Sequence, residues 1–438
     1  RPVASVDARS ALASVGRALR HRNYRLFFIG QGISMIGTWV TRIAMSWLVY
    51  RLTNSSLLLG LTGFAGQLPT FLIAPFAGVI VDRSDRYRLL LVTQVLSMLQ
   101  SGLLAYYALS GTITAWHVLF LAIFQGLING FDTPARQAFI VDMVDKREDL
   151  PNAIALNSSL VNVARLVGPS VAGVLISVVG EGVCFTVDAL SYVGVICALL
   201  GMRIVKRERE VKQAHFASEL REGFAYVAGF APIRDLLLLL AVVSLAGLPY
   251  AVLMPVFATQ VFHGGAHTLG WLMTSTGVGA LVAALWLASR PSVLGLARVV
   301  TAAGSVFGLA LIAFSYTRTL WLGLPLLVLV GGGMMMQMAA TNTLIQTLVD
   351  ERMRGRVMSF YTMAFFGMMP FGSLLAGFVA SHWSAESAVR SGGLLTVLAV
   401  LLFWRRLPVL RQQMRPIYER LGILQPMAAP ELSEPAGR

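Results

Sequence analysis

Long apolar runs constrain the fold of this 438-residue chain more than any other feature. A transmembrane helix needs roughly 20 consecutive, predominantly apolar residues. Twelve such runs are present, in two groups of six: 26–50, 57–81, 89–109, 117–142, 153–178, 183–204, 235–261, 269–289, 298–316, 319–346, 357–381 and 389–404. Because 56% of the residues are hydrophobic and only 13% are charged, a bilayer must surround them. The sequence therefore predicts an all-α membrane protein with twelve transmembrane helices in two six-helix bundles.

The positive charges are distributed unevenly between the connections. The chain has 35 Lys and Arg against 21 Asp and Glu, a net charge of +14. Thirty of the 35 fall in the two ends of the chain and in the even-numbered connections between runs. Membrane proteins keep such charges on the cytoplasmic side, so we expect both termini there. The same distribution argues against nucleic acid as a partner.

A polar interruption separates the two groups of runs. It carries Phe216, Leu220 and Phe224 four residues apart, a spacing typical of an amphipathic helix. Such a helix either lies on the membrane surface or is a solvated linker. The first 24 residues are rich in Arg and lack an apolar core, so we expect no cleavable signal peptide. The expected organisation is a cytoplasmic N-terminal segment, a six-helix bundle, a cytoplasmic linker with an amphipathic helix, a second bundle and a cytoplasmic tail: 1–24, 25–204, 205–233, 234–405 and 406–438.

The two groups of runs also resemble each other in sequence. Leu59-Gly60-Leu61 matches Leu269-Gly270-Trp271, and Gly168-Pro169-Ser170-Val171-Ala172-Gly173 matches Gly372-Ser373-Leu374-Leu375-Ala376-Gly377. The matches occur in the same order in both halves, which indicates a duplicated, pseudo-symmetric six-helix unit. Parallel repeats of this kind place a transport site between them, near the middle of the membrane.

A short charged loop connects the second and third runs. Residues 78–88 read Gly-Val-Ile-Val-Asp-Arg-Ser-Asp-Arg-Tyr-Arg. Charges placed so densely between two apolar helices can hold helix ends together through ion pairs and helix dipoles. The alternative is that the loop only fixes the topology of the chain.

The spacing G-x-x-x-D-R-x-x-R-x-R in this loop resembles the signature loop between helices 2 and 3 of the major facilitator superfamily. In that family the aspartate faces the N-terminus of helix 11, and the later arginine pairs with an acid at the end of helix 4. The resemblance assigns these roles to Asp82, Arg86 and Asp142, with helix 11 beginning near residues 354–356, and implies a latch that closes the cytoplasmic side. The expected gate residues are Gly78, Asp82, Arg83, Arg86, Arg88 and Asp142. Asp85 departs from the family pattern, where glycine is usual.

Other segments narrow the resemblance. Gly168, Pro169 and Gly173 lie in a segment similar to the G-P-x-x-G-G motif of the superfamily's proton-coupled exporters, although Ala172 replaces one glycine. Residues 47–53, 131–139 and 150–158 resemble the bacterial drug and siderophore exporter branch that includes the enterobactin exporter. The resemblance implies a secondary transporter of the bacterial inner membrane. It would export small amphipathic compounds by alternating access, driven by proton antiport.

Four ionisable residues fall inside the apolar runs: Arg42, Asp132, Arg165 and Asp188. Buried charges are costly in a bilayer and mark functional sites or proton relays. Each acid is therefore a candidate for proton coupling. The alternatives are static pairs, with Asp188 meeting Arg165 or Arg42, and with Asp132 neutralised by Arg136 one turn away.

Polar, aromatic and methionine side chains are candidates for the substrate cavity. Nine of the eighteen methionines lie in 334–369, after three glycines at 331–333 that we expect to let the helix bend. Met side chains adapt to varied apolar ligands, although ordinary packing explains them equally well. The candidate contacts are Gln31, Trp39, Gln125, Asn129, Met336 and Gln337.

Catalytic and nucleotide-binding motifs are missing from the sequence. None of the three lysines follows a glycine, so no P-loop is present, and no metalloprotease motif or Cys–His cluster occurs. We therefore expect no enzyme activity, no cofactor and no bound metal. The expected partners are a small-molecule or lipid substrate, protons and membrane lipids. Lysophospholipid transport by the same fold remains an alternative, and a receptor or integral membrane enzyme without transport is a further one.

Overall fold

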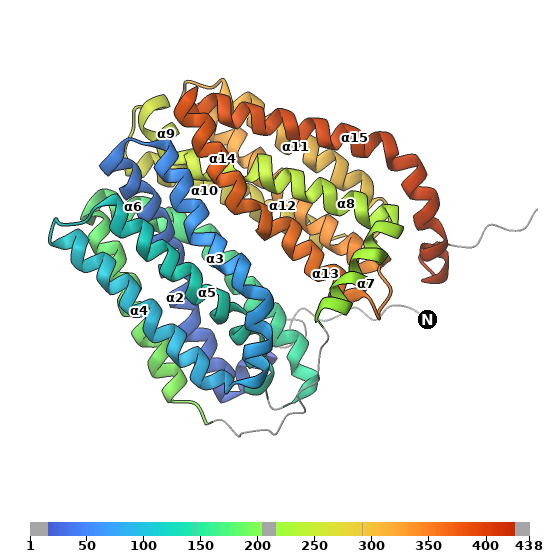
Figure 1. The fold of residues 1–438 in the computed structure, drawn as a ribbon, viewed down its shortest axis with the longest axis horizontal. Coiled ribbons are helices and arrows are strands. Elements are labelled where there is room, and N and C mark those ends of the chain that lie inside the picture. Colours follow the sequence, from blue (N-terminus) through green and yellow to red (C-terminus); the bar gives the residue numbers. More distant parts are fainter. Residues whose placement is uncertain (1–15, 145, 204–215, 291, 425–438) are drawn as a thin grey trace, which may run out of the picture.

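The computed structural model describes residues 16–144, 146–203, 216–290 and 292–424 (Figure 1). In these residues only helices and their connections occur. The first half contains α2 (Arg22–Thr53), α3 (Ser56–Arg83), α4 (Arg86–Leu109), α5 (Ala115–Met143) and α6 (Leu150–Leu200), preceded or joined by the single turns η1 (Arg17–Arg20) and η2 (Arg147–Asp149).

The second half begins with α7 (Phe216–Gly229) and continues through a long irregular helix. That helix runs as α8 (Ala231–Val242), η3 (Val243–Gly247), η4 (Leu248–Leu253), α9 (Met254–Val256) and η5 (Phe257–Val261). Pro249 and Pro255 lack backbone N–H donors, which accounts for the local departures from α geometry. The remaining helices are α10 (Ala266–Ala288), α11 (Leu296–Ser315), α12 (Leu320–Leu348), α13 (Arg354–Thr362), η6 (Met363–Gly367), α14 (Met368–His382) and α15 (Ala385–Arg420).

The described helices other than α7 and the single turns η1 and η2 provide twelve membrane crossings. Ten helices are long and apolar enough to cross a membrane. One of them, α6, supplies two crossings because Gly180, with φ of 80°, kinks it in the middle. The twelfth is α2, which has 32 residues and carries the polar side chains of Gln31 and Arg42 in mid-helix. The predicted twelve-helix, all-α fold is confirmed.

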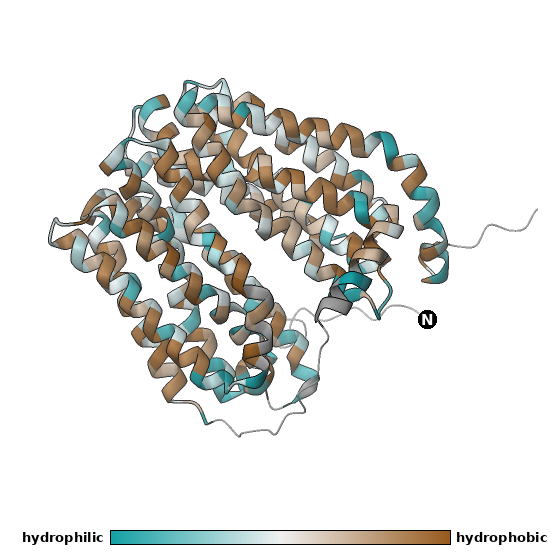
Figure 2. Ribbon diagram, viewed as in Figure 1, coloured by the Kyte–Doolittle hydropathy of each residue, from teal (hydrophilic) through white to brown (hydrophobic). Residues whose placement is uncertain are grey.

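The last helix extends farther than the sequence pattern predicts. The apolar run ends at 404, but α15 continues to Arg420. Its extension buries Leu407, Leu410, Met414 and Tyr418, whose spacing of three or four residues forms one apolar face. Figure 2 shows this extension as a hydrophilic segment at the far end of an apolar helix. The predicted tail from 406 therefore begins inside a helix.

The two halves meet through two glycine crossings. An added Cβ at Gly60 of α3 would lie 2.8 Å from the Cα of Gly377 in α14. At the second crossing, a Cβ at Gly173 of α6 would lie 2.4 Å from the Cα of Gly270 in α10. Helix backbones approach this closely only where side chains are absent. We call these four glycines the glycine seam. They are the same four residues that the internal repeat matches in sequence.

The seam joins the halves at one end of the molecule. Gly60 lies near the start of α3, and Gly377 lies near the end of α14. The Phe64 and Phe371 rings pack edge-on at 5.8 Å, and the hydroxyls of Ser170 and Thr274 lie 2.7 Å apart. Away from the seam, the ribbons of α3 and α13 diverge (Figure 1).

Helix α7 packs against α13. Glu222 forms an ion pair with Arg356 at 2.6 Å, and the Phe224 and Phe360 rings lie 6.4 Å apart. The predicted linker helix is therefore in contact with the second bundle through Glu222 and the Phe224 ring, although Phe224 stays 63% exposed. The side chains of Phe216 and Leu220 lie outside the described residues.

Candidate transport site

Asp132 is the centre of a buried polar cluster in the first half. It lies on α5, and only 4% of it is exposed. One carboxylate oxygen accepts hydrogen bonds from Thr93 at 2.9 Å and Gln94 at 2.7 Å, both on α4. The other oxygen pairs with Arg136 at 2.5 Å, one helical turn away. The neutralising pair that the spacing allowed is therefore present.

Asp188 is the second buried carboxylate, on the later part of α6. It is 1% exposed and accepts a 2.7 Å hydrogen bond from the Ser101 hydroxyl. Among the described residues, neither Arg42 nor Arg165 pairs with it, so the predicted static pair is not formed. Asp188 approaches α2 at Gly37, where an added Cβ would lie 2.7 Å from its Oδ1. Arg42 is five residues from Gly37 and about 140° around the helix, so it points elsewhere.

A stripe of polar side chains on α4 connects the two acids. Its members lie on one face of the helix and are all nearly inaccessible: Thr93, Gln94, Ser97, Gln100 and Ser101. Thr93 and Gln94 contact Asp132, and Ser101 contacts Asp188. Sequence reasoning missed this stripe. The signal was available, because polar residues recur at 93, 97 and 101 within an apolar run.

Two of the predicted cavity residues extend this network. Gln125 of α5 donates to the Ser97 hydroxyl at 3.3 Å and to the Asn129 side chain at 3.1 Å. On the opposite side, the Thr38 hydroxyl lies 3.2 Å from the Tyr192 hydroxyl. Hydrogen-bonding groups therefore surround the stripe on α2, α5 and α6. The polar groups thus link two buried carboxylates, and buried ionisable residues are candidates for functional sites in membrane proteins.

Two arginines flank Trp39 of α2. The Arg42 guanidinium lies 5.1 Å from the ring centroid and that of Arg165, on α6, lies 5.6 Å from it, both within cation–π range. In the described part of the chain neither arginine has a carboxylate partner. Gly168 allows this arrangement because an added Cβ there would lie 2.3 Å from the Cβ of Trp39. The exporter-like motif thus contributes Gly168 to the Trp39 contact and Gly173 to the glycine seam.

The charged loop brings two of its predicted partners together. Arg86 lies 3.8 Å from Asp142 and donates to the Ala138 carbonyl at 3.0 Å. Asp85 caps the N-terminus of α4 by accepting from the backbone N–H groups of Tyr87 and Arg88. An acid suits this position because the helix dipole favours negative charge there, which explains the departure from glycine.

The remaining gate predictions concern α3 and α13. Arg83 is exposed, and the Gly78 and Asp82 side-chain positions lie outside what the structure describes. The predicted start of helix 11 coincides with α13, which begins at Arg354. Here Arg356 meets Glu222 of α7.

Some predicted cavity residues are buried inside their own halves. Gln31 is buried, and Gln337 is 1% exposed with its side chain beside Gly304 of α11. Met336 is half-buried. Helix α12 is continuous from Leu320 to Leu348 and contains the three glycines at 331–333. These glycines admit close neighbours, since a Cβ at Gly331 would lie 1.8 Å from the Thr276 carbonyl oxygen.

Comparison with known proteins identifies the family. The sequence profile described as "Transmembrane secretion effector" matches residues 13–433. The chain belongs to this family. Secretion effectors of this type are major facilitator transporters rather than enzymes, in agreement with the twelve-helix architecture and with the loop motif at 78–88.

Transporters that are named for their cargo are found among the relatives of this chain. The staphyloferrin A transporter of Staphylococcus aureus is 26% identical over 385 residues, covering 87% of this chain and 95% of the relative. The multidrug efflux pump Tap of Mycolicibacterium fortuitum is 25% identical over 352 residues, covering 78% and 85%. These relatives place the chain among multi-pass membrane proteins related to siderophore and drug efflux transporters.

Solved structures support the same fold at lower identity. A bacterial homologue of the human lysosomal transporter Spinster, in an inward-facing and occupied conformation, is 14% identical with a TM-score of 0.69, covering 91% of this chain and 98% of that chain. A bacterial homologue of the iron transporter ferroportin, in an inward-facing state, is 17% identical with a TM-score of 0.64, covering 88% and 98%. At these identities the likeness concerns the fold alone.

Proposed function

We propose that this secretion effector exports small amphipathic compounds, siderophore-like or drug-like, from the bacterial cytoplasm by proton antiport. The cargoes named for its relatives support the substrate class. The distribution of Lys and Arg supports an inner-membrane topology with both termini in the cytoplasm. Under this topology the glycine seam closes the periplasmic end, so the structure corresponds to an inward-facing transporter.

The buried acids bridged by the α4 stripe are the observation that carries the proton-coupling proposal. Asp132 has a permanent counter-charge in Arg136, whereas Asp188 is held by a hydroxyl. In an apolar interior a carboxylate without a cation is the group best suited to exchange a proton. We assign proton binding and release to Asp188. The Asp132–Arg136 pair orients the far end of the stripe.

Proton antiport requires that proton binding be coupled to the opening and closing of the contact between the two halves. Asp188 contacts α2 at Gly37, two residues before Trp39, and Trp39 packs on Gly168 of α6. The same part of α6 carries Gly173 of the glycine seam. A change in the charge of Asp188 therefore acts on the two helices that position the Trp39 contact. Trp39, Arg42 and Arg165 are the proposed substrate contacts, offering an aromatic face and two cations to an amphipathic molecule.

Reconstituted transport tests the coupling assignment. In proteoliposomes with a proton gradient, Asp188→Asn is expected to abolish gradient-driven efflux of a siderophore or lipophilic drug while leaving counterflow exchange measurable. Asp132→Asn is expected to impair both, because Arg136 would be left buried without a partner. The matched control is Glu351→Gln, which removes an exposed carboxylate outside the helices. Wild-type gradient-driven efflux in Asp188→Asn would refute the assignment.

The charged loop is proposed to latch the cytoplasmic end. In the outward-facing state, Asp82 would engage the N-terminus of α13, while the Arg86–Asp142 pair holds α4 against α5. In the present structure Arg356 of α13 pairs with Glu222 of α7, so closure of the latch would also act on this pair.

Lipid transport is the second candidate function. The observation that favours it is Arg42, an exposed residue in the middle of α2 whose guanidinium has no carboxylate partner among the described residues and suits a lipid phosphate. Lysophospholipid flipping in the same proteoliposomes separates the two candidates. Flipping that depends on Arg42, together with no efflux of soluble amphipathic compounds, would favour lipid as the cargo.

A further inference from the structure

A basic pocket lies between α11 and α15, away from the transport site. Its volume is about 610 Å³, and eight residues line it: Arg298, Thr301, Ala302, Trp404, Arg405, Leu407, Pro408 and Arg411. The helices that α11 and α15 mainly contact belong to the second half. The pocket is therefore on the outer side of the second bundle and not on the seam between the halves.

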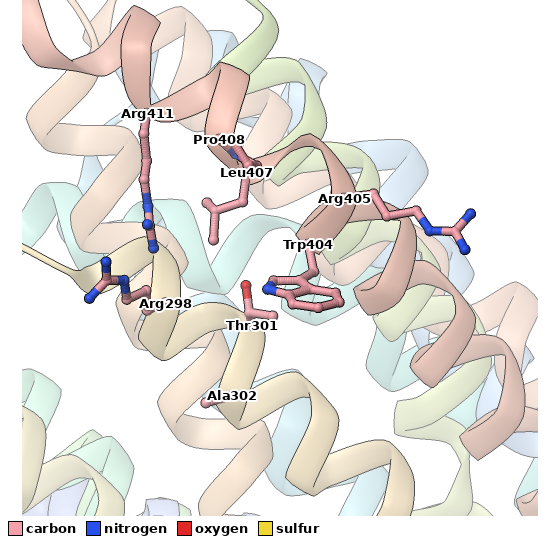
Figure 3. A pocket seen from close by; sticks show the side chains of 8 residues that line it. All are labelled: Arg298, Thr301, Ala302, Trp404, Arg405, Leu407, Pro408 and Arg411. Atoms are coloured by element: carbon pink, nitrogen blue, oxygen red, sulfur yellow. The ribbon is translucent and has the colours of Figure 1, made fainter.

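Two guanidinium groups converge on this pocket. Figure 3 shows Arg298 of α11 and Arg411 of α15 extending toward the same region, while Arg405 extends away from it. The positive charges of Arg298 and Arg411 are near enough to repel each other. No salt bridge to an acid involves either of them in the described ranges. Bringing two like charges together is unfavourable, so an anion placed between them would be stabilised by both.

The surroundings of the pocket match the boundary between acyl chains and headgroups. Large apolar side chains are exposed along α15 up to this level, among them Leu394, Leu398 and Leu402. Trp404 follows and is 58% exposed, with its indole facing Thr301 in Figure 3. Tryptophan is enriched at this depth of a membrane, and arginines immediately beyond it lie at the level of lipid phosphates. Leu407 and Pro408 supply an apolar wall.

We propose that this pocket binds the phosphate headgroup of an anionic phospholipid from the leaflet on which α11 begins. The bidentate donors of Arg298 and Arg411 would hold the phosphate oxygens. Trp404 and Leu407 would contact the glycerol and the first acyl carbons. Basic pockets between transmembrane helices on the cytoplasmic side are suited to such lipids. The proposal does not depend on the substrate or on proton coupling.

Thermal unfolding with added lipid tests the proposal. Purified protein in a neutral detergent is titrated with phosphatidylglycerol, with phosphatidylcholine or with inorganic phosphate. A ligand that binds only the folded state raises Tm according to its affinity. We expect phosphatidylglycerol to raise Tm and the other two additions to leave it unchanged. An equal rise with inorganic phosphate would overturn the lipid assignment in favour of a small-anion site.

Paired variants locate the effect. Each cation near an anionic lipid contributes about fivefold in affinity, so Arg298→Gln with Arg411→Gln should weaken phosphatidylglycerol binding about 30-fold. The control, Arg352→Gln with Arg354→Gln, removes two exposed arginines from the same end of the second half, outside the pocket. It should respond like wild type. A wild-type response in the pocket variant would refute the site.

A single variant and a second measurement test the site in case the double variant folds poorly. Arg298→Gln alone should weaken the lipid effect about fivefold. Native mass spectrometry should detect one fewer tightly bound phosphatidylglycerol in that variant than in the control. An equal number of retained lipids in both would also refute the site.

Discussion

Gly60→Ala is expected to shift the protein away from the conformation described here. The new Cβ would lie 2.5 Å from the Ser373 carbonyl oxygen and 2.8 Å from the Gly377 Cα, where ordinary contacts begin near 3.4 Å. All these neighbours are backbone atoms, so the two helices must separate. Overpacking of this kind costs about 1–3 kcal/mol. Since the clash exists only while the seam is closed, the closed state should lose about 5- to 150-fold in population.

Distances between spin labels measure this shift. Cysteines placed at the exposed positions Ser110 and Ser381 report the separation of the halves at the seam end. The background removes Cys184 and Cys197, the two native cysteines, both of which are free thiols. We expect Gly60→Ala to move the distance distribution toward longer values. Added substrate or a proton gradient should then enlarge the long-distance population in wild type as well.

A matched substitution separates the clash from a general effect of alanine. Gly102 of α4 has nothing within 4 Å of its added Cβ, so Gly102→Ala gains the same helix propensity without a clash. Its distance distribution should equal that of wild type. If Gly60→Ala and Gly102→Ala give the same distribution, close backbone approach does not set the conformational balance and the reasoning is refuted.

Three further outcomes are expected. Arg86→Ala should slow transport several-fold with Tm retained, and a wild-type rate would reduce the loop to a topology signal. The hydrogen bond from His21 lowers the pKa of Asp149, so their interaction stabilises the fold at neutral pH and is lost as pH falls through that lowered pKa. The Tm deficit of His21→Ala should therefore vanish in acid, and a pH-independent deficit would contradict this. Glu222→Gln should speed amide hydrogen exchange in α7 by up to about fivefold, because an exposed pair such as that with Arg356 contributes about 0.2–1 kcal/mol; unchanged exchange would show that the pair is negligible.

Hydropathy and motif spacing predicted the architecture well because polar or charged residues inside a membrane span are energetically costly, so the spans stand out as apolar runs. The twelve runs correspond to twelve crossings, and α13 begins at the expected residue. Where the sequence pattern and the structure differ, side-chain direction is the cause. Asp188 of α6 was a plausible partner for Arg42, yet it approaches α2 at Gly37, whereas Arg42 projects from a different side of α2. Apolar content identifies a span, but it does not show which side of the span meets which neighbour.

The candidate site was predicted in part. Asp132 and its neutralisation by Arg136 follow from a spacing of four residues on one helix. The α4 stripe was not predicted, although polar residues recur at 93, 97 and 101, because single Thr, Ser and Gln residues are common inside apolar runs; their burial and contacts show that they form one cluster with the two acids. Gln337, predicted as a cavity contact, is buried in this structure, and that burial could not be read from the sequence. Its helix passes beside Gly304, which leaves room for a polar side chain inside the second bundle.

The glycine seam has the geometry of a two-fold symmetric dimer. Gly60 and Gly270 are equivalent positions in the two repeats, and so are Gly173 and Gly377. Gly60 contacts Gly377 and Gly270 contacts Gly173, so the same two positions meet at both crossings. Interfaces between two identical subunits related by a two-fold axis have this isologous form. The glycine seam therefore consists of the same helix contact formed twice, once on each side of the pseudo-two-fold axis. An alanine in one crossing should tilt the halves toward the other, and a matching alanine in the second crossing should restore a symmetric, more open joint.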